Sequence, residues 1–246
     1  GLVFNLNYLG NGVYEYVDNE FTLEPGTYLI QILAQKENYA EQSKSTVIEV
    51  EERETDIKVY YEGVVVNQIN TKWVRSLRVE AEYLDITTGT EEQITDAEVF
   101  YLEVVKYEAG QNVTVVFYGN MQLNATSGRY YLDILFDNIT DGTYYIKVTM
   151  AKQHYTTQIK TVTLVVNLRE MIGIASDYKV EVLYGDVANI TIQLTDKDTE
   201  EPISDATYTI VTTPEDITPA ITLTPKGNGI YELIIDSDEV PTPTSY

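Results

Sequence analysis

The sequence contains no cysteine and only one histidine, His154. Without cysteine the chain can form no disulfide, no thiolate nucleophile and no cysteine-ligated zinc or iron–sulfur site. A single histidine also excludes a metal centre built from several histidines. No apolar run approaches the roughly 20 residues that cross a bilayer, so we expect no membrane contact from this segment.

Basic residues are scarce as well. The 246 residues include 16 Lys and Arg against 39 Asp and Glu, which gives a formal net charge of −23. Such a charge repels phosphate backbones and anionic lipid surfaces, and we therefore predict no nucleic-acid partner. The chain nevertheless has enough apolar residues to form a hydrophobic core, because 43% of its residues are apolar and 21 residues are tyrosines. Disorder is a poor fit to that composition.

Motifs for catalysis are missing too. The sequence has no Gly-x-Ser-x-Gly, no phosphate-binding glycine loop and no histidine-rich group. Pairs of carboxylates are common in any chain this acidic, so their presence does not indicate a glycosidase or an acid–base catalyst. We predict that the segment is not an enzyme and that it holds no cofactor, with calcium as the one candidate.

The strongest positive signal is an internal repeat. Residues 11–39 and 127–155 align without a gap at an offset of 116 positions, as between Gly12 and Gly128. Identical residues at this offset are Gly12/Gly128, Tyr14/Tyr130, Gly26/Gly142, Tyr28/Tyr144, Lys36/Lys152 and Tyr39/Tyr155. In this alignment His154 replaces Asn38, which predicts that it is a turn residue rather than a general base.

Shorter matches extend the repeat. Asn228-Gly229-Ile230-Tyr231 resembles Ser127-Gly128-Arg129-Tyr130, and Ile203-Ser204-Asp205-Ala206 resembles Ile94-Thr95-Asp96-Ala97. Asp177-Tyr178-Lys179-Val180 is matched to the opening strand at Asp56-Ile57-Lys58-Val59. One complete unit, residues 53–168, is thus flanked by two partial units, residues 1–52 and 169–246. We expect the chain to be a slice of a longer tandem array.

Hydrophobic residues alternate with period two along most of the chain. In the stretch 143–150, Tyr144, Ile146, Val148 and Met150 would face inward, and Lys147 and Thr149 outward. This alternation is typical of antiparallel strands with one buried face. Six or seven short strands per unit, about ten residues apart, predict an all-β fold of serial β-sandwiches. Tyrosines at inward positions, which we expect in the core, are Tyr28, Tyr83, Tyr144 and Tyr208.

A family resemblance follows from two corners. Asp141-Gly142-Thr143-Tyr144 and Pro25-Gly26-Thr27-Tyr28 resemble the turn before strand F of an immunoglobulin-like sandwich, where a tyrosine hydroxyl bonds to the chain upstream. The run from 182 to 206 is similar to the front half of immunoglobulin-like modules in prokaryotic adhesins, invasin-like proteins and surface-layer proteins. The chain departs from antibody domains in having no cysteine pair, and Trp73 precedes strand B.

The resemblance implies a domain organisation and a setting. Residues 1–52 would be the C-terminal half of an immunoglobulin-like domain, 53–168 a complete domain and 169–246 the N-terminal part of another. The protein would be extracellular, on a prokaryotic and in particular an archaeal cell surface. Its partners would be other copies of itself or other surface proteins, with glycans as a further candidate.

The resemblance also implies a structural function, as a spacer or stalk, a surface-layer module or a filament module. One alternative is an adhesin or carbohydrate-binding module, for which exposed Tyr118, Tyr131 and Tyr145 would form the binding surface. A second alternative is a set of accessory domains of a large secreted enzyme.

Two kinds of site can be suggested from sequence. Glu51, Glu52, Glu54 and Asp56 could supply oxygen ligands to calcium between two units, but we favour the alternative that they are a solvated charge run. Four Asn-x-Thr sequons predict N-glycosylation of a surface glycoprotein. Their asparagines are Asn112, Asn124, Asn138 and Asn189. The two corner tyrosines, Tyr28 and Tyr144, are predicted to be structural.

Overall fold

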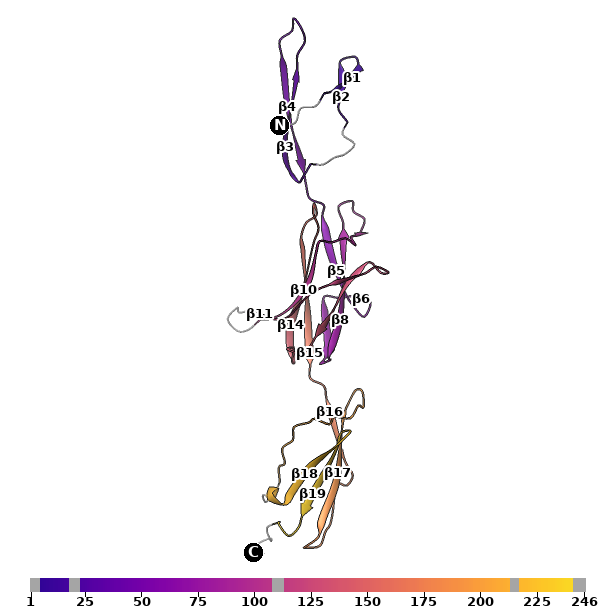
Figure 1. The fold of residues 1–246 in the computed structure, drawn as a ribbon, viewed down its shortest axis with the longest axis vertical. Coiled ribbons are helices and arrows are strands. Elements are labelled where there is room, and N and C mark those ends of the chain that lie inside the picture. The colour runs from indigo at the N-terminus through magenta and orange to yellow at the C-terminus, as the bar shows by residue number, and fades with distance from the viewer. Residues whose placement is uncertain (1–4, 18–22, 108–112, 213–216, 241–246) are drawn as a thin grey trace. The chain divides into compact units, whose positions relative to one another are not determined.

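The computed structural model describes residues 5–17, 23–107, 113–212 and 217–240 (Figure 1). Among these residues almost all regular structure is β-strand, and the helical element is a three-residue 3-10 turn, Thr218–Ala220. Contacts group the chain into two compact bodies. One holds residues 1–69, 75–139 and 143–164, and the other holds residues 70–74, 140–142 and 165–246.

Residues 53–168, called the central sandwich below, form two sheets. The first has the order β11-β10-β14-β15-β7. Its strands are β11 (Val113–Asn120), β10 (Val99–Tyr107), β14 (Gly142–Ala151), β15 (Gln158–Asn167) and β7 (Gln68–Lys72). The second has the order β12-β13-β8-β5-β6, with β9 added to β8. Its strands are β12 (Gln122–Asn124), β13 (Arg129–Leu135), β8 (Ser76–Asp85), β5 (Thr55–Tyr61), β6 (Val64–Val65) and β9 (Glu92–Gln93).

This connectivity is that of an immunoglobulin-like sandwich. In chain order β5, β8, β10, β12, β13, β14 and β15 correspond to strands A to G, so one sheet contains D-E-B-A and the other C-F-G. The predicted all-β, immunoglobulin-like fold class is confirmed.

The core of the central sandwich lies where the alternation predicts. Tyr144, Ile146, Val148 and Met150 of β14 are all buried. On the opposite sheet the buried residues of β8 include Leu77, Val79, Ala81 and Tyr83. Of the two residues of β14 predicted to face outward, Lys147 is partly accessible, whereas Thr149 is buried. Aliphatic side chains and tyrosines thus occupy the core of a sandwich that has no disulfide.

Residues 1–52, the N-terminal segment, contain two hairpins and no second layer among the residues described. Strand β1 (Asn7–Gly10) pairs with β2 (Val13–Glu15), and β3 (Gly26–Ala34) pairs with β4 (Gln42–Val50). At the offset of 116 residues these hairpins are the counterparts of β12–β13 and β14–β15. Tyr28 is only half-buried here, because its segment has half of a sandwich.

Residues 169–246, the C-terminal segment, form one sheet with the order β16-β17-β19-β18. The strands are β16 (Met171–Ala175), β17 (Val187–Asp196), β19 (Ile230–Asp236) and β18 (Ile221–Gly227). They reproduce the A-B-E-D order of the second sheet in the central sandwich. The fold is therefore one complete and two partial immunoglobulin-like units.

Two expectations for the C-terminal segment were wrong. The opening strand is β16 rather than residues 177–180, which form no strand, and Tyr178 is almost fully exposed. The register shows why: Met171 pairs with Asp196 as Thr55 pairs with Asp85, so the two opening strands are 116 residues apart, and the aspartates that they face are 111 apart. Tyr208, expected in the core, is exposed because no C-F-G sheet covers it among the described residues.

Candidate functional site

The D-E-B-A sheet of the central sandwich and the A-B-E-D sheet of the C-terminal segment are called the front sheets below. At the start of each front sheet a buried carboxylate binds an arginine. Nε of Arg53 lies 2.5 Å from Oδ2 of Asp85, and Nε of Arg169 lies 2.7 Å from Oδ2 of Asp196. The two arginines are again 116 residues apart, and each is followed by a glutamate. We call this arrangement, an arginine after strand G bound to the aspartate that ends strand B, the joint clamp.

The position of each aspartate follows from the local fold. Asp85 is the last residue of β8, and its Oδ1 accepts the backbone N–H of Thr87 at 3.0 Å. Asp196 ends β17 in the same way, and its Oδ1 accepts the N–H groups of Asp198 and Thr199 at 2.9 and 3.0 Å. Aspartate favours such turns because its short side chain caps the backbone two residues on. The second carboxylate oxygen is left to bind the arginine.

The electrostatics of the clamp favour ionised aspartates. Burial by itself would raise the pKa of Asp85, but hydrogen bonds from Thr87 and from Arg53 outweigh it and hold that pKa below its ordinary value. For Asp196 the hydrogen bond from the backbone of Thr199 is the largest effect lowering the pKa, opposed by burial and assisted by Arg169. Both carboxylates are buried, so each pair is only partly screened by water.

The backbone at Arg53 is held as well. Its N–H donates to the oxygen of His154, and its own oxygen accepts the N–H of Thr156, both at 2.9 Å. Two residues further along the chain, the hydroxyl of Thr55 donates to the backbone oxygen of Thr156 at 2.6 Å. The hydroxyl of Tyr83 donates to the same oxygen at 3.0 Å. Three hydrogen bonds therefore fix Arg53 and Thr55 to the F–G turn of the central sandwich, and a fourth joins Tyr83 of β8 to the same turn.

That F–G turn is repeated in the N-terminal segment. His154 and Asn38 both have φ of 67°, a left-handed conformation that asparagine and histidine tolerate better than most residues. In each turn a lysine lies over a tyrosine ring, at 5.0 Å for Lys152 on Tyr155 and 5.3 Å for its counterpart on Tyr39. His154 is thus a turn residue.

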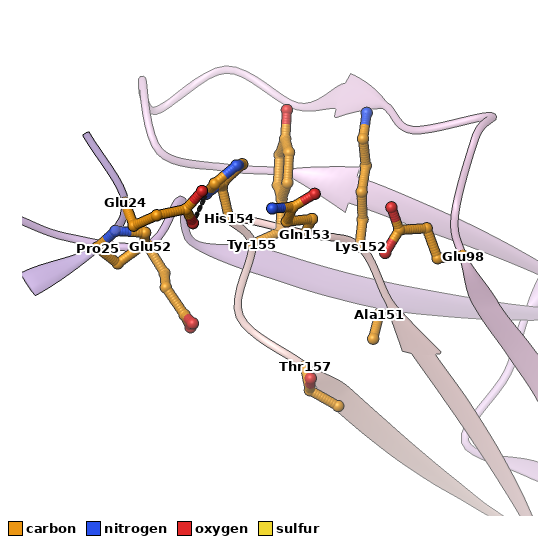
Figure 2. A pocket seen from close by; sticks show the side chains of 10 residues that line it. All are labelled: Glu24, Pro25, Glu52, Glu98, Ala151, Lys152, Gln153, His154, Tyr155 and Thr157. Carbon is orange, nitrogen blue, oxygen red and sulfur yellow. Dashed lines mark ion pairs between the residues drawn. The ribbon is translucent and has the colours of Figure 1, made fainter. Parts of the chain in front are cut away.

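The side chains beside the turn border an open hollow of about 480 Å³ (Figure 2). His154 Nδ1 lies 3.2 Å from a carboxylate oxygen of Glu24 at one end of it. At the other end, Lys152 stands near Glu98 and forms an ion pair with Asp96 at 2.7 Å. The hollow is wide and mostly polar.

The four carboxylates suggested as calcium ligands are not gathered together. Glu51, Glu52 and Glu54 are exposed, and Asp56 accepts the N–H of Ile57 at 2.8 Å. Throughout the part of the chain that the structure describes, no three acidic or histidine side chains form a group that could hold a metal ion. The four suggested ligands therefore do not form such a group, and calcium binding stays a prediction.

Three of the four sequon asparagines lie in described regions, and Asn112 lies outside them. Asn138 is exposed in a turn. Asn189 is exposed on β17, where its Nδ2 donates to Glu232 at 2.8 Å. Asn124 is half-buried at the end of β12, and its side-chain oxygen accepts the N–H of Thr126 at 3.0 Å. Glycosylation of all four stays a prediction.

The corner tyrosines and the outward tyrosines behave differently. The hydroxyl of Tyr28 donates to the backbone oxygen of Glu24 at 2.7 Å, the upstream bond that a tyrosine corner makes, and Tyr144 is buried at the equivalent position.

Outward tyrosines form two pairs on the sheet of β10, β11 and β14. Ring centroids are 5.6 Å apart for Tyr101–Tyr118 and 5.0 Å apart for Tyr107–Tyr145.

A third outward tyrosine, Tyr131, lies on the other sheet, where the guanidinium of Arg78 stands 4.7 Å from the centre of its ring. The pairing of Glu103 with Lys147 separates the two tyrosine pairs on the first sheet. The outward tyrosines that we named from sequence are therefore not brought together into one patch.

Sequence comparison gives no identity for the chain: no protein-family model and no curated protein matches it. Solved structures with some similarity include murine CRIg, 12% identical over 47% of this chain and 98% of that one, with a TM-score of 0.29. Another is the soluble domain of PmoD from Methylocystis sp. (strain Rockwell), 11% identical over 46% of this chain and 90% of its own, with a TM-score of 0.27.

Among the described residues no helix is long and apolar enough to cross a membrane.

Proposed function

We propose that this chain is a structural spacer of a cell surface, a stalk, surface-layer or filament module whose domains are joined with little freedom. The joint clamp is the observation that supports this proposal. It occurs in both front sheets with the same residue types and the same atoms, Nε of arginine on Oδ2 of aspartate. A spacer needs a short connection because the number of free residues between two domains sets the range of angles between them.

The clamp shortens each flexible connection. Strand β4 ends at Val50 and β5 begins at Thr55, but Arg53 is already bound on both sides of its peptide, which leaves only Glu51 and Glu52 between fixed points. At the second joint, β15 ends at Asn167 and Arg169 is bound to Asp196. The second joint is therefore as short as the first. A connection of one or two residues has few torsions through which to bend.

The charge of the chain suits the same function. A net charge of −23 keeps many identical surfaces hydrated and mutually repelling, which protects exposed strand edges from pairing indiscriminately. The setting that we propose is extracellular, since serial immunoglobulin-like sandwiches without cofactors serve this purpose on cell surfaces.

Distance measurements across the first joint test the proposal. Because the chain has no native cysteine, spin labels can be placed on Ser45→Cys in β4 and Thr161→Cys in β15, both of which are exposed. A spacer predicts a narrow distribution of distances between the labels, which Arg53→Gln broadens. Arg78→Gln, which removes an exposed arginine–aspartate pair within one sheet, is the control and should leave the width unchanged. A distribution that is broad before any substitution contradicts the spacer function.

A binding module is the second candidate, and the two tyrosine pairs favour it. Aromatic rings on an exposed sheet face can stack on sugars. Titration of the chain with oligosaccharides, followed by the tyrosine side-chain resonances, would show shifts confined to Tyr101, Tyr107, Tyr118 and Tyr145. Shifts elsewhere or none at all would leave the spacer as the better account.

A further inference from the structure

Two pairs of tyrosine rings lie on the outer face of the sheet that contains β10, β11 and β14. The planes of Tyr101 and Tyr118 are inclined at 45°, and those of Tyr107 and Tyr145 at 78°. At centroid separations of 5.6 and 5.0 Å, these are the tilted and edge-to-face contacts that aromatic pairs favour. Each pair therefore brings two phenol rings from neighbouring strands into direct contact.

The strand register places both pairs. Tyr118 of β11 stands opposite Glu103 of β10, which is two residues from Tyr101. Tyr145 of β14 lies diagonally from Tyr107 of β10 in the same way. Diagonal neighbours on one face of a sheet are still within reach of each other when their side chains are aromatic. All four positions belong to the central sandwich, in which both sheets are present.

Solvent reaches both pairs. Tyr118 is 60% exposed and Tyr107 is 49% exposed, and their two partners are half-buried. Tyr131, the outward tyrosine of the other sheet, has different surroundings. Its ring lies against the guanidinium of Arg78, and its hydroxyl donates to the side chain of Gln122 at 2.9 Å. A small diffusible oxidant can thus reach all these rings, but only the paired ones touch a second phenol in the central sandwich as described.

We propose that the two tyrosine pairs are sites of oxidative cross-linking, at which each pair is converted into one dityrosine. The oxidant is hydrogen peroxide used by a peroxidase. Each phenol loses one electron and one proton, and the two radicals join by a carbon–carbon bond between the ring carbons next to the hydroxyls. The hydrogens on the joined carbons move to the two oxygens and restore the phenols. One hydrogen peroxide takes up the two electrons and two protons and becomes two molecules of water.

The surroundings favour coupling within each pair. Reacting groups that are already held in contact combine far faster than groups that must meet by diffusion. Between the two pairs stands the ion pair of Glu103 and Lys147, whose charged atoms are 3.7 Å apart, so the pairs are kept separate on the sheet. Coupling between chains is opposed by the net charge of −23 that every copy carries.

The two links would join three consecutive strands. Strand β11 lies at the edge of its sheet and pairs with β10 alone, so the link between Tyr101 and Tyr118 fixes that edge. The link between Tyr107 and Tyr145 joins β10 to β14. A cross-link between residues distant in sequence stabilises a fold mainly by restricting the unfolded chain, which a disulfide cannot do in a protein without cysteine. The inference rests on ring geometry and is independent of the spacer function.

Peptide mapping tests the proposal. The full chain, kept dilute, is treated with hydrogen peroxide and a haem peroxidase. The product should stay monomeric and lose the mass of two hydrogen atoms for each link. Trypsin releases residues 107–129, which contain Tyr107 and Tyr118, as one peptide. This peptide should be joined to the preceding one, which contains Tyr101, and to the following one, which contains Tyr145. Products joined mainly between chains would overturn the proposal.

Single substitutions separate the two links. Tyr118→Phe should abolish the first link and keep the second, and Tyr145→Phe should do the reverse. Tyr131→Phe is the matched control, which should keep both, and circular dichroism melting shows that each variant is folded. A third ring pair, Tyr8 and Tyr14 of the β1–β2 hairpin, stays unchanged in every variant and adds a constant background to the dityrosine fluorescence. A double variant, Tyr118→Phe with Tyr145→Phe, that fluoresces as strongly as Tyr131→Phe would contradict the assignment.

Discussion

Ile30 and Ile146 occupy the same place in two copies of one repeat, yet Ile146 is fully buried and Ile30 is 38% exposed. Each follows a Gly-Thr-Tyr corner by two residues and lies in strand F of its unit. The pair is a comparison within one molecule, because residue type, neighbouring sequence and backbone conformation are shared. What differs is the opposite sheet, which the described N-terminal segment lacks.

Substitution of this pair by alanine should therefore have unequal effects. Ile146→Ala removes buried methyl groups and leaves a cavity, and it should lower the free energy of unfolding of the central sandwich by about 2–5 kcal/mol. Ile30→Ala should change it by less than about 0.5 kcal/mol. Urea unfolding followed by far-ultraviolet circular dichroism measures the loss for each variant. Equal losses for the two variants would mean that the N-terminal segment has a buried core of its own.

The bond from Ala97 to the hydroxyl of Tyr130 allows a second comparison. Tyr130→Phe leaves the N–H of Ala97 buried without its partner, and we expect a loss of about 1–3 kcal/mol in the same unfolding assay. The adjacent Tyr131 bonds at the surface to the side chain of Gln122, so Tyr131→Phe should cost less than about 0.5 kcal/mol. A Tyr130→Phe variant as stable as the parent would show that water reaches this N–H.

Much of the fold could be predicted from sequence because period-two alternation depends only on local chain geometry. The buried residues of β8 and β14 follow from it directly, whereas the three-unit pattern follows from the repeat at an offset of 116. The limits of alternation also explain why the expected burial of Tyr208 is wrong. Alternation shows which side of a strand is apolar, but it does not show whether a second sheet is present to cover it. Alternation therefore predicts a buried Tyr208, which is exposed in the structure.

The joint clamp was missed for a different reason. Arg53 and Asp85 are 32 positions apart, and nothing local connects a residue after strand G to the end of strand B. The sequence nevertheless contains a signal, since Val50, Arg53 and Glu54 recur as Val166, Arg169 and Glu170 at the offset of 116. The repeat at this offset thus continues about fifteen residues past Tyr39 and includes both arginines. Their aspartate partners can be identified only from the strand register of the folded structure.

The clamp should contribute more to stability than an exposed pair of the same type. In a double-mutant cycle with Arg53→Gln and Asp85→Asn, the coupling should exceed that of Arg78→Gln with Asp133→Asn. Asp85 is buried and held by Thr87, whereas Arg78 and Asp133 are both largely exposed and pay side-chain entropy to meet. Thermal melting of the four single and two double variants measures both couplings. A larger coupling for the exposed pair would contradict a structural role for the clamp.

Acid should weaken the clamp in a defined pH range. The pKa of Asp85 is lower in the folded protein than in the unfolded chain, so ionised Asp85 stabilises the fold above the ordinary aspartate pKa of about 3.9. This stabilisation is lost as the pH falls through the lower, folded pKa, because Arg53 stays charged while the carboxylate takes up a proton. The difference in stability between the parent and Asp85→Asn should be constant from about pH 7 to pH 5 and shrink below about pH 4. Urea titrations of both proteins across this range measure it, and the subtraction removes the effect of the other 38 acidic residues. A difference that grows on acidification would require a folded pKa above the ordinary value, with Asp85 protonated and the clamp held by a neutral hydrogen bond.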